Sequence, residues 1–141
     1  MRRIIFGFLV CIAMVSSNTR IATSADDSAG TAIALVIERQ ISAFQKNDLQ
    51  RAFSYASPTI QKKFGTPEVF GKMVEMGYPM VWRPSRWQMV KLVDTSHGLV
   101  QVVLFVDESG REYEAGYLMQ QIDGGWRVNG VHVRRRPSVG A

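Results

Sequence analysis

The apolar residues of this chain follow two different periods, and the change between them falls near residue 78. Before it, apolar side chains recur three or four positions apart, as at Ile33, Ile37 and Ile41, which is the spacing of one face of an amphipathic helix. After it, they alternate with polar residues or form short apolar runs, which is typical of strands. Helices followed by consecutive strands predict an α+β fold rather than alternating α/β units.

Cap residues set the ends of the expected helices. Asp48, Ser57 and Thr66 can each accept a backbone N–H at a helix start, and proline follows the last two at the first helical position. Residues 26–31 are small and polar and are expected to lead into the first helix. Four helices are therefore predicted, at 33–46, around 52–53, at 58–64 and at 67–77.

Four antiparallel strands are expected in the second half, at 86–93, 99–106, 111–122 and 126–133. No linker divides the chain, so residues 26–136 are predicted to form a single α+β domain in which the N-terminal helices pack in the concave face of a strongly curved antiparallel sheet of about four strands. The chain is too short to cover the other face of the sheet as well, which leaves that face to solvent or to a partner subunit.

The register of the last hairpin has two alternatives. A two-residue loop at Gly124–Gly125 would place Tyr117 opposite His132. A loop of three residues would place Gly116 there instead. Because a slip of one residue exchanges the two faces of a strand, the sequence leaves open whether Tyr117 lines a pocket or the outer face. Trp126 and His132 are expected to share a face in either register.

The first 25 residues have the pattern of a bacterial secretory signal peptide. Arg2 and Arg3 form a positive start, residues 4–15 an apolar stretch, and residues 23–25 a small-residue cleavage site that ends at Ala25. A transmembrane anchor is the alternative, but it needs about 20 apolar residues, and polar residues at 16–20 interrupt this run. We therefore predict cleavage after Ala25, export to the periplasm and no stable membrane span afterwards.

The sole cysteine, Cys11, lies inside the predicted signal peptide. Val10 precedes it instead of the small residue that lipoprotein processing requires, so lipidation is not expected. A mature chain without cysteine excludes disulfides, thiolate nucleophiles, cysteine-ligated zinc and iron–sulfur clusters. No cofactor is expected.

The formal net charge of +5 is concentrated at the two ends of the chain. Removal of the signal peptide would take away three arginines, and Arg134, Arg135 and Arg136 carry three more positive charges at the other end. The body between them is close to neutral, so nucleic acid is not an expected partner. We interpret the C-terminal arginines as part of a frayed, solvated end, with residues 137–141 disordered.

Several short motifs occur in a fixed order along the chain. They are ISAF at 41–44 with AFSYASP at 52–58, FGTP at 64–67, the stretch 73–79 that ends in Gly77-Tyr78-Pro79, and DGGWRVNG at 123–130. In their order and spacing they resemble an uncharacterised family of exported bacterial proteins, a domain of unknown function in the nuclear-transport-factor-2-like (cystatin-like cone) superfamily. The resemblance covers nearly the whole predicted mature chain.

This resemblance implies a cone, with helices in the concavity of a bent sheet and homodimers formed through the sheet face. It implies no activity, because the superfamily includes steroid isomerase-like and polyketide cyclase-like enzymes as well as binding and assembly modules. The chain is also similar to the superfamily in having a histidine six residues after the tryptophan of the last strand, here His132 after Trp126.

The residues themselves predict no catalytic or metal site. An isomerase-like reaction needs a carboxylate base in an apolar pocket, but the acidic residues fall at turns, at caps or on polar faces, and Glu112 and Glu114 share one strand face. His132 is the one catalytic candidate, although we favour a histidine in the core or at a dimer face. His97 lies in a turn, and two distant histidines do not make a metal site.

Aromatic and methionine side chains gather where the helices meet the sheet. The candidates for lining a ligand pocket are Tyr78, Trp82, Tyr117, Trp126 and His132. Met73, Met76 and Met80 fall at helical spacing and are expected to pack in the core. Arg83 and Arg86, beside the tryptophans, could meet an anionic head group.

Three hypotheses for function follow from the sequence. The leading one is a non-enzymatic periplasmic module that binds a small apolar or amphipathic ligand, or pairs with itself or with another protein. The second is an isomerase-like or hydrolyase-like enzyme that uses His132 with a tyrosine. The third is a cell-envelope assembly factor without a pocket.

Overall fold

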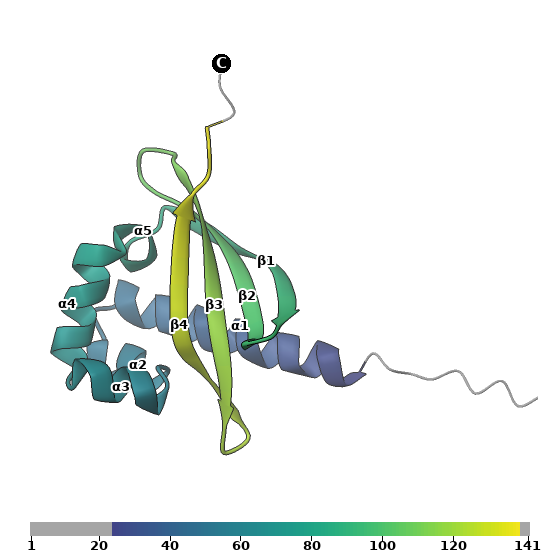
Figure 1. The fold of residues 1–141 in the computed structure, drawn as a ribbon. Coiled ribbons are helices and arrows are strands. Elements are labelled where there is room, and N and C mark those ends of the chain that lie inside the picture. The colour runs from purple at the N-terminus through teal and green to yellow at the C-terminus, as the bar shows by residue number, and fades with distance from the viewer. Residues whose placement is uncertain (1–23, 139–141) are drawn as a thin grey trace, which may run out of the picture.

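The computed structural model describes residues 24–138, and within them five helices precede four strands (Figure 1). The helices are α1 (Ser24–Gln45), α2 (Leu49–Ser54), α3 (Pro58–Phe64), α4 (Pro67–Gly77) and α5 (Pro79–Trp82). The strands are β1 (Arg86–Thr95), β2 (Gly98–Val106), β3 (Glu112–Ile122) and β4 (Gly125–Arg135). The predicted α+β class, with helices first and a four-stranded antiparallel sheet after them, is confirmed. Nearly all of the predicted signal peptide, 1–25, and the last three residues of the predicted tail, 137–141, lie outside the described residues.

The three predicted helix caps are present. Asp48 accepts the backbone N–H of Arg51 at 3.1 Å, and Ser57 and Thr66 do the same for the residues three positions later. Two features differ from the prediction. The leader at 26–31 is already helical, since α1 begins at Ser24, and the hydroxyl of Thr31 donates to the backbone oxygen of Asp27 one turn earlier. A one-turn helix, α5, begins at Pro79, since proline is favoured at a first helical position.

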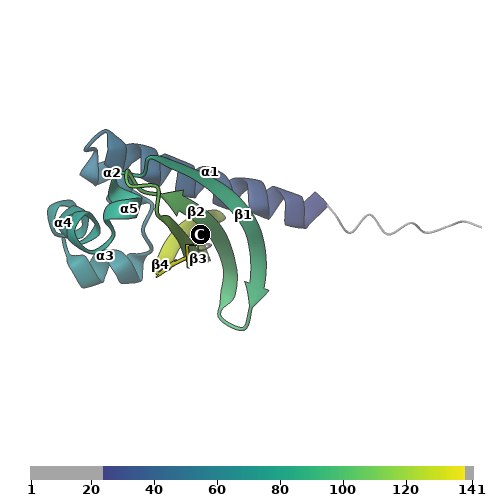
Figure 2. The same cartoon turned by 90° about the horizontal axis from the view of Figure 1, so that it is seen from above.

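The sheet has the order β1-β2-β3-β4, and the helices lie on one of its faces, with α1 running across it (Figure 2). Ile33, Ile37 and Ile41 of α1 are at most 1% exposed, and their apolar stripe packs in one core with Phe105 and Tyr117 from the sheet. The residues that recur at helical spacing in the sequence therefore form the buried face of α1. Burial of this stripe is the main apolar contribution to holding the helical layer on the sheet.

The last hairpin has a register that neither predicted loop describes. Ile122 pairs with Gly125, so the loop is Asp123–Gly124, and both loop residues have positive φ, as a two-residue hairpin turn of this class requires. Further along, β4 contains a bulge: Met119 pairs with Val128 but Leu118 pairs with Gly130. The extra residue in β4 is Asn129.

This bulge changes which side chains of β4 face the helices. Gly116 lies opposite His132, as one of the two predicted registers had it. The prediction that Trp126 and His132 share a face is wrong, because one extra residue between them reverses the alternation. Trp126 packs against the core, whereas His132 is exposed on the outer face.

Arg83 joins the end of α1 to the helix before the sheet. Its Nη1 donates to the backbone oxygens of Phe44 at 2.6 Å and Trp82 at 2.8 Å, and its Nη2 donates to Oδ1 of Asn47 at 2.6 Å. The guanidinium also lies 4.6 Å from the ring centroid of Trp82. Arg83 is therefore occupied by the protein itself, which contradicts its predicted role beside a head group.

We expect Arg83→Met to lower the free energy of unfolding by about 1–3 kcal/mol, because it leaves the carbonyl of Phe44 and the amide of Asn47 without their donor. Urea unfolding followed by circular dichroism measures this loss. Arg86→Met is the matched control, since Arg86 is exposed at the start of β1 and should change the value by less than about 0.5 kcal/mol. Equal effects of the two substitutions would contradict the anchoring role.

Candidate functional site

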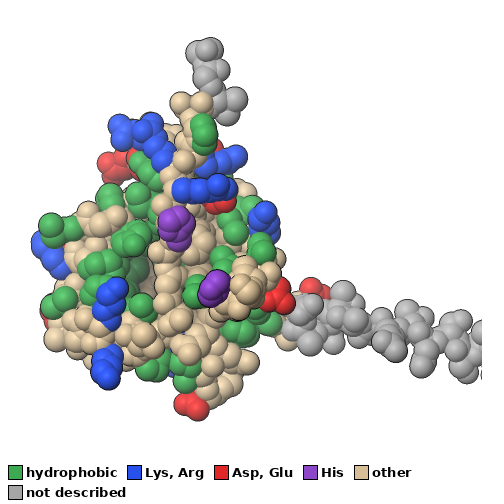
Figure 3. Space-filling view, viewed as in Figure 1, with side chains coloured by type: hydrophobic (Ala, Val, Ile, Leu, Met, Phe, Trp, Pro, Cys, Tyr) green, Lys and Arg blue, Asp and Glu red, His purple; other side chains and the backbone are tan. Residues whose placement is uncertain are grey.

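A cavity of about 290 Å³ lies between the helices and the edge strand β4. One wall is formed by α3, α4 and the residues that follow α4, the other by Tyr117 of β3 and residues 128–131 of β4, and Gln40 and Phe44 of α1 contribute as well. Figure 3 shows a hollow at this place, rimmed by apolar side chains, with basic side chains over α3 beside it. The volume is at the lower end of the range found for small-molecule sites.

Phenylalanine rings make the helical wall of the cavity. The ring of Phe70 lies at its centre, with centroid distances of 5.9 Å to Phe44 and 5.8 Å to Phe64, both of which also line the cavity. Phe53 supports Phe70 from behind at 5.3 Å. Tilted and edge-on contacts at these distances are the favourable geometries for aromatic pairs. The helical wall is therefore built from aromatic rings that pack on one another.

Two amides at the cavity are used to hold the backbone. Gln40 is 3% exposed and its Nε2 donates to the backbone oxygen of Ala52 at 3.0 Å. Oδ1 of Asn129, the bulge residue, accepts from the hydroxyl of Ser57 at 2.7 Å. The contact of Gln40 connects α1 to α2, and the contact of Asn129 connects β4 to the residue before α3.

Tyr117 is the polar group of the cavity that has no such use. Its side chain is 1% exposed and lies on the face of the sheet that the helices cover, which settles the alternative that the sequence left open. Its hydroxyl makes no hydrogen bond within the described residues. Burial raises the pKa of Tyr117 well above its usual range, so the hydroxyl remains protonated and can donate.

The charged residues are sparse around this cavity. Among the described residues that line it, Lys63 is the only one with a charge, and aspartate, glutamate and histidine do not occur. A proton transfer from carbon would need a base within hydrogen-bond reach of the substrate. The described lining supplies two tyrosines, Tyr78 and Tyr117, and a cation in Lys63, but no carboxylate or imidazole.

The five predicted pocket residues divide into two groups. Tyr78 and Tyr117 both line the cavity. Trp82 lies outside it and packs on Phe44 at a centroid distance of 5.6 Å. Trp126 is partly buried in the core away from the cavity, and His132 lies on the opposite face of the sheet because of the bulge.

The model of a family described as a domain of unknown function, DUF4864, matches residues 26–141. The chain belongs to this family. The predicted membership of an uncharacterised family is thus confirmed, while the relationship to the nuclear-transport-factor-2-like superfamily stays a prediction. The search of curated proteins found no match for this DUF4864 chain.

Some functional candidates of the DUF4864 domain could not be found from the sequence. Lys63 lines the cavity and lies outside the quoted motifs, and Asn129 lines it from within the motif at 123–130, where no local signal marks it as a bulge residue. Of the three methionines predicted to be in the core, Met73 lines the cavity and Met80 packs against the core, but Met76 is 74% exposed. The three methionines fall at helical spacing, but α4 ends at Gly77 and a separate turn begins at Pro79, so they do not lie on one continuous helix face.

The uncovered face of the DUF4864 sheet carries a shallow groove. It is lined by apolar side chains such as Val100, Val102 and Leu118 and by the two histidines, His97 and His132. Within the described part of the chain, no three histidine, cysteine or acidic side chains are placed to hold a metal ion, and no helix is long and apolar enough to cross a membrane. The predicted homodimer through this face stays a prediction.

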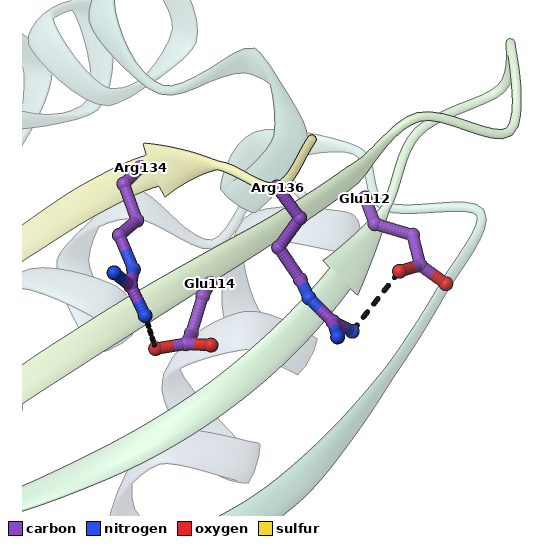
Figure 4. A network of polar contacts seen from close by, with 4 residues as sticks. All are labelled: Glu112, Glu114, Arg134 and Arg136. Atoms are coloured by element: carbon purple, nitrogen blue, oxygen red, sulfur yellow. Dashed lines mark hydrogen bonds and ion pairs between the residues drawn. The ribbon is translucent and has the colours of Figure 1, made fainter. Parts of the chain in front are cut away.

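The C-terminal arginines are more ordered than the sequence suggested. Arg134 pairs with Glu114 at 2.7 Å and Arg136 pairs with Glu112 at 3.0 Å across β3 and β4 (Figure 4). The two glutamates do share a face, as expected, but each has an arginine partner. The prediction of a frayed end is therefore wrong for Arg134, Arg135 and Arg136, because β4 extends to Arg135 and Arg136 still bonds to Glu112.

We expect Tyr117→Phe to raise the free energy of unfolding by about 1 kcal/mol, because it removes a buried hydroxyl that has no partner. Wild type should also lose stability as the pH rises above about 10, where the unfolded tyrosine ionises and the buried one does not, and the variant should lose less. Urea unfolding at neutral and alkaline pH measures both effects.

Tyr113→Phe is the control for this prediction. The hydroxyl of Tyr113 donates to Oδ2 of Asp107 at 3.3 Å, so its removal should leave stability unchanged or slightly lower. A loss of stability in Tyr117→Phe at neutral pH would show that its hydroxyl has a partner in solution.

Proposed function

We propose that this DUF4864 domain is a non-enzymatic binding module that holds a small apolar or amphipathic ligand in the cavity between α3, α4 and β4. One observation carries the proposal: a mostly apolar cavity of about 290 Å³ whose lining includes Tyr117, a buried residue whose hydroxyl has no hydrogen-bond partner among the described residues. Pockets that are mostly apolar and have a few placed polar groups are the usual form of small-molecule sites.

The small side chains of the lining leave room for a ligand. Ala56, Val74 and Val128 line the cavity at positions where larger side chains would narrow it. A ligand in the cavity would make dispersion contacts with these apolar side chains.

Binding without catalysis is favoured by the composition of the lining. General acid–base chemistry would require a base that takes up a proton from the substrate, and the described lining contains no carboxylate or imidazole. His132, the candidate of the enzymatic hypothesis, lies on the other face of the sheet from Tyr117. The two cannot act on one bound molecule.

The wider setting is part of the same proposal. We propose that the domain is a cone of the nuclear-transport-factor-2-like type, exported to the bacterial periplasm after cleavage at Ala25. Support comes from the helices on one face of a four-stranded antiparallel sheet and from the family match, which begins at residue 26. A ligand cavity between helices and sheet fits this arrangement.

Two tryptophan substitutions on α4 test the proposal. Met73→Trp should fill the cavity and lower the affinity for 1-octanol, a neutral probe with an apolar chain, at least tenfold. Met76→Trp introduces the same side chain one turn later, where Met76 is 74% exposed and outside the cavity, and should leave the affinity unchanged. Titration followed by NMR shifts of residues near Tyr117 and Val128 measures both.

Native mass spectrometry of the protein purified from cells gives a second readout, since a ligand retained in the cavity adds a reproducible small mass. That mass should be absent from Met73→Trp and present in Met76→Trp. Two outcomes would overturn the binding function and favour an assembly role. In the first, octanol binds both variants equally. In the second, wild type neither binds octanol nor carries a retained mass.

A further inference from the structure

Lys63 lines the cavity, and its ammonium has no acidic partner among the described residues. The residue is exposed near the end of α3. Its Nζ lies 5.5 Å from the ring centroid of Phe64, which also lines the cavity. The cation is thus held beside the apolar wall instead of extending away from it.

The helix dipole favours a basic residue in the last turn of α3, but it does not explain why that residue lies at the cavity. A basic residue in the last turn of a helix is stabilised by the helix dipole. Lys62 is in the same last turn of α3 and meets that requirement equally, yet it does not line the cavity. The position of Lys63 at the cavity is therefore a separate property of this chain, and the adjacent lysine is a natural comparison for it.

The two ends of the cavity differ in chemistry. Inside, the walls are mostly apolar, with Phe70 and Val74 buried, and the hydroxyl-bearing residues of the described lining are Tyr78 and Tyr117. At the exposed rim, Lys63 offers a positive charge that water still reaches. An anionic group would pair there without being desolvated completely, whereas a cation would be repelled and a charge of either sign inside would be costly.

We infer that the ligand is an amphipathic anion, with a short alkyl or aryl body in the cavity and an anionic head group at Lys63. This inference rests on the proposed function and adds the ligand class to it. The volume of about 290 Å³ suits a single short chain or one ring and is too small for a lipid with two long chains. Carboxylate, sulfate and phosphate head groups share the required chemistry.

A series of eight-carbon probes with one chain and different head groups tests the ligand class. Octanoate, octyl sulfate and octyl phosphate should each bind wild type more tightly than 1-octanol, and octylammonium should bind most weakly. We expect a preference for octanoate over octanol of roughly two- to fivefold, the size of an exposed ion pair, and it should shrink as salt is added. The three anions rank the head groups against one another.

Lys63→Gln should abolish the preference for octanoate and leave the affinity for octanol unchanged. Lys63→Glu should reverse the order, so that octylammonium binds more tightly than octanoate. Lys62→Gln removes an equal charge from the same turn and should keep the wild-type preference. Thermal melting should be close to wild type in all three, because both lysines are exposed.

The outcomes separate this inference from the function on which it rests. The role of Lys63 would be overturned if octanol and octanoate bound wild type equally, or if Lys62→Gln removed the preference as Lys63→Gln does. In both cases the cavity would still bind apolar chains. Failure of every probe, with hexyl and decyl analogues included, would overturn the binding function itself.

Discussion

The structure depends on one junction, where the segment between α2 and α3 is bonded to the edge strand β4. The backbone N–H of Ser57 donates to the oxygen of Val128 and the N–H of Val128 donates to the oxygen of Tyr55, both at 2.8 Å. The side chain of Ser57 adds its bond to Asn129. Because α3 follows directly from Ser57, these bonds fix the distance between α3 and β4, and with it the width of the cavity.

The same junction decides which residues form the site. Asn129 is the extra residue of the bulge, so Val128 before it and Val131 after it both line the cavity although they are three positions apart. A strand without the bulge would turn His132 toward the helices and Val131 away from them. The extra residue Asn129 therefore keeps the imidazole of His132 out of the cavity and leaves its walls mostly apolar.

Local signals in the sequence predicted the elements, and contacts between distant segments decided the site. Periodicity and caps such as Ser57 gave the helices and strands because those signals lie within a few residues of each other. The bulge could not be predicted, since its extra residue, Asn129, bonds to Ser57, which lies 72 positions earlier, and no local pattern reports such a contact. Arg83 was misassigned for a similar reason: its partners, Phe44 and Asn47, are more than thirty positions away.

Two properties of the same region support the proposed binding function. Tyr117 lines the cavity, and its buried hydroxyl has no hydrogen-bond partner among the described residues, a cost of about 1–3 kcal/mol that phenylalanine would avoid. Small side chains such as Ala56 and Val128 keep the cavity open where larger ones would narrow it. Natural domains keep features that do not favour stability where function requires them. A binding function accounts for both properties, whereas a purely structural role explains neither.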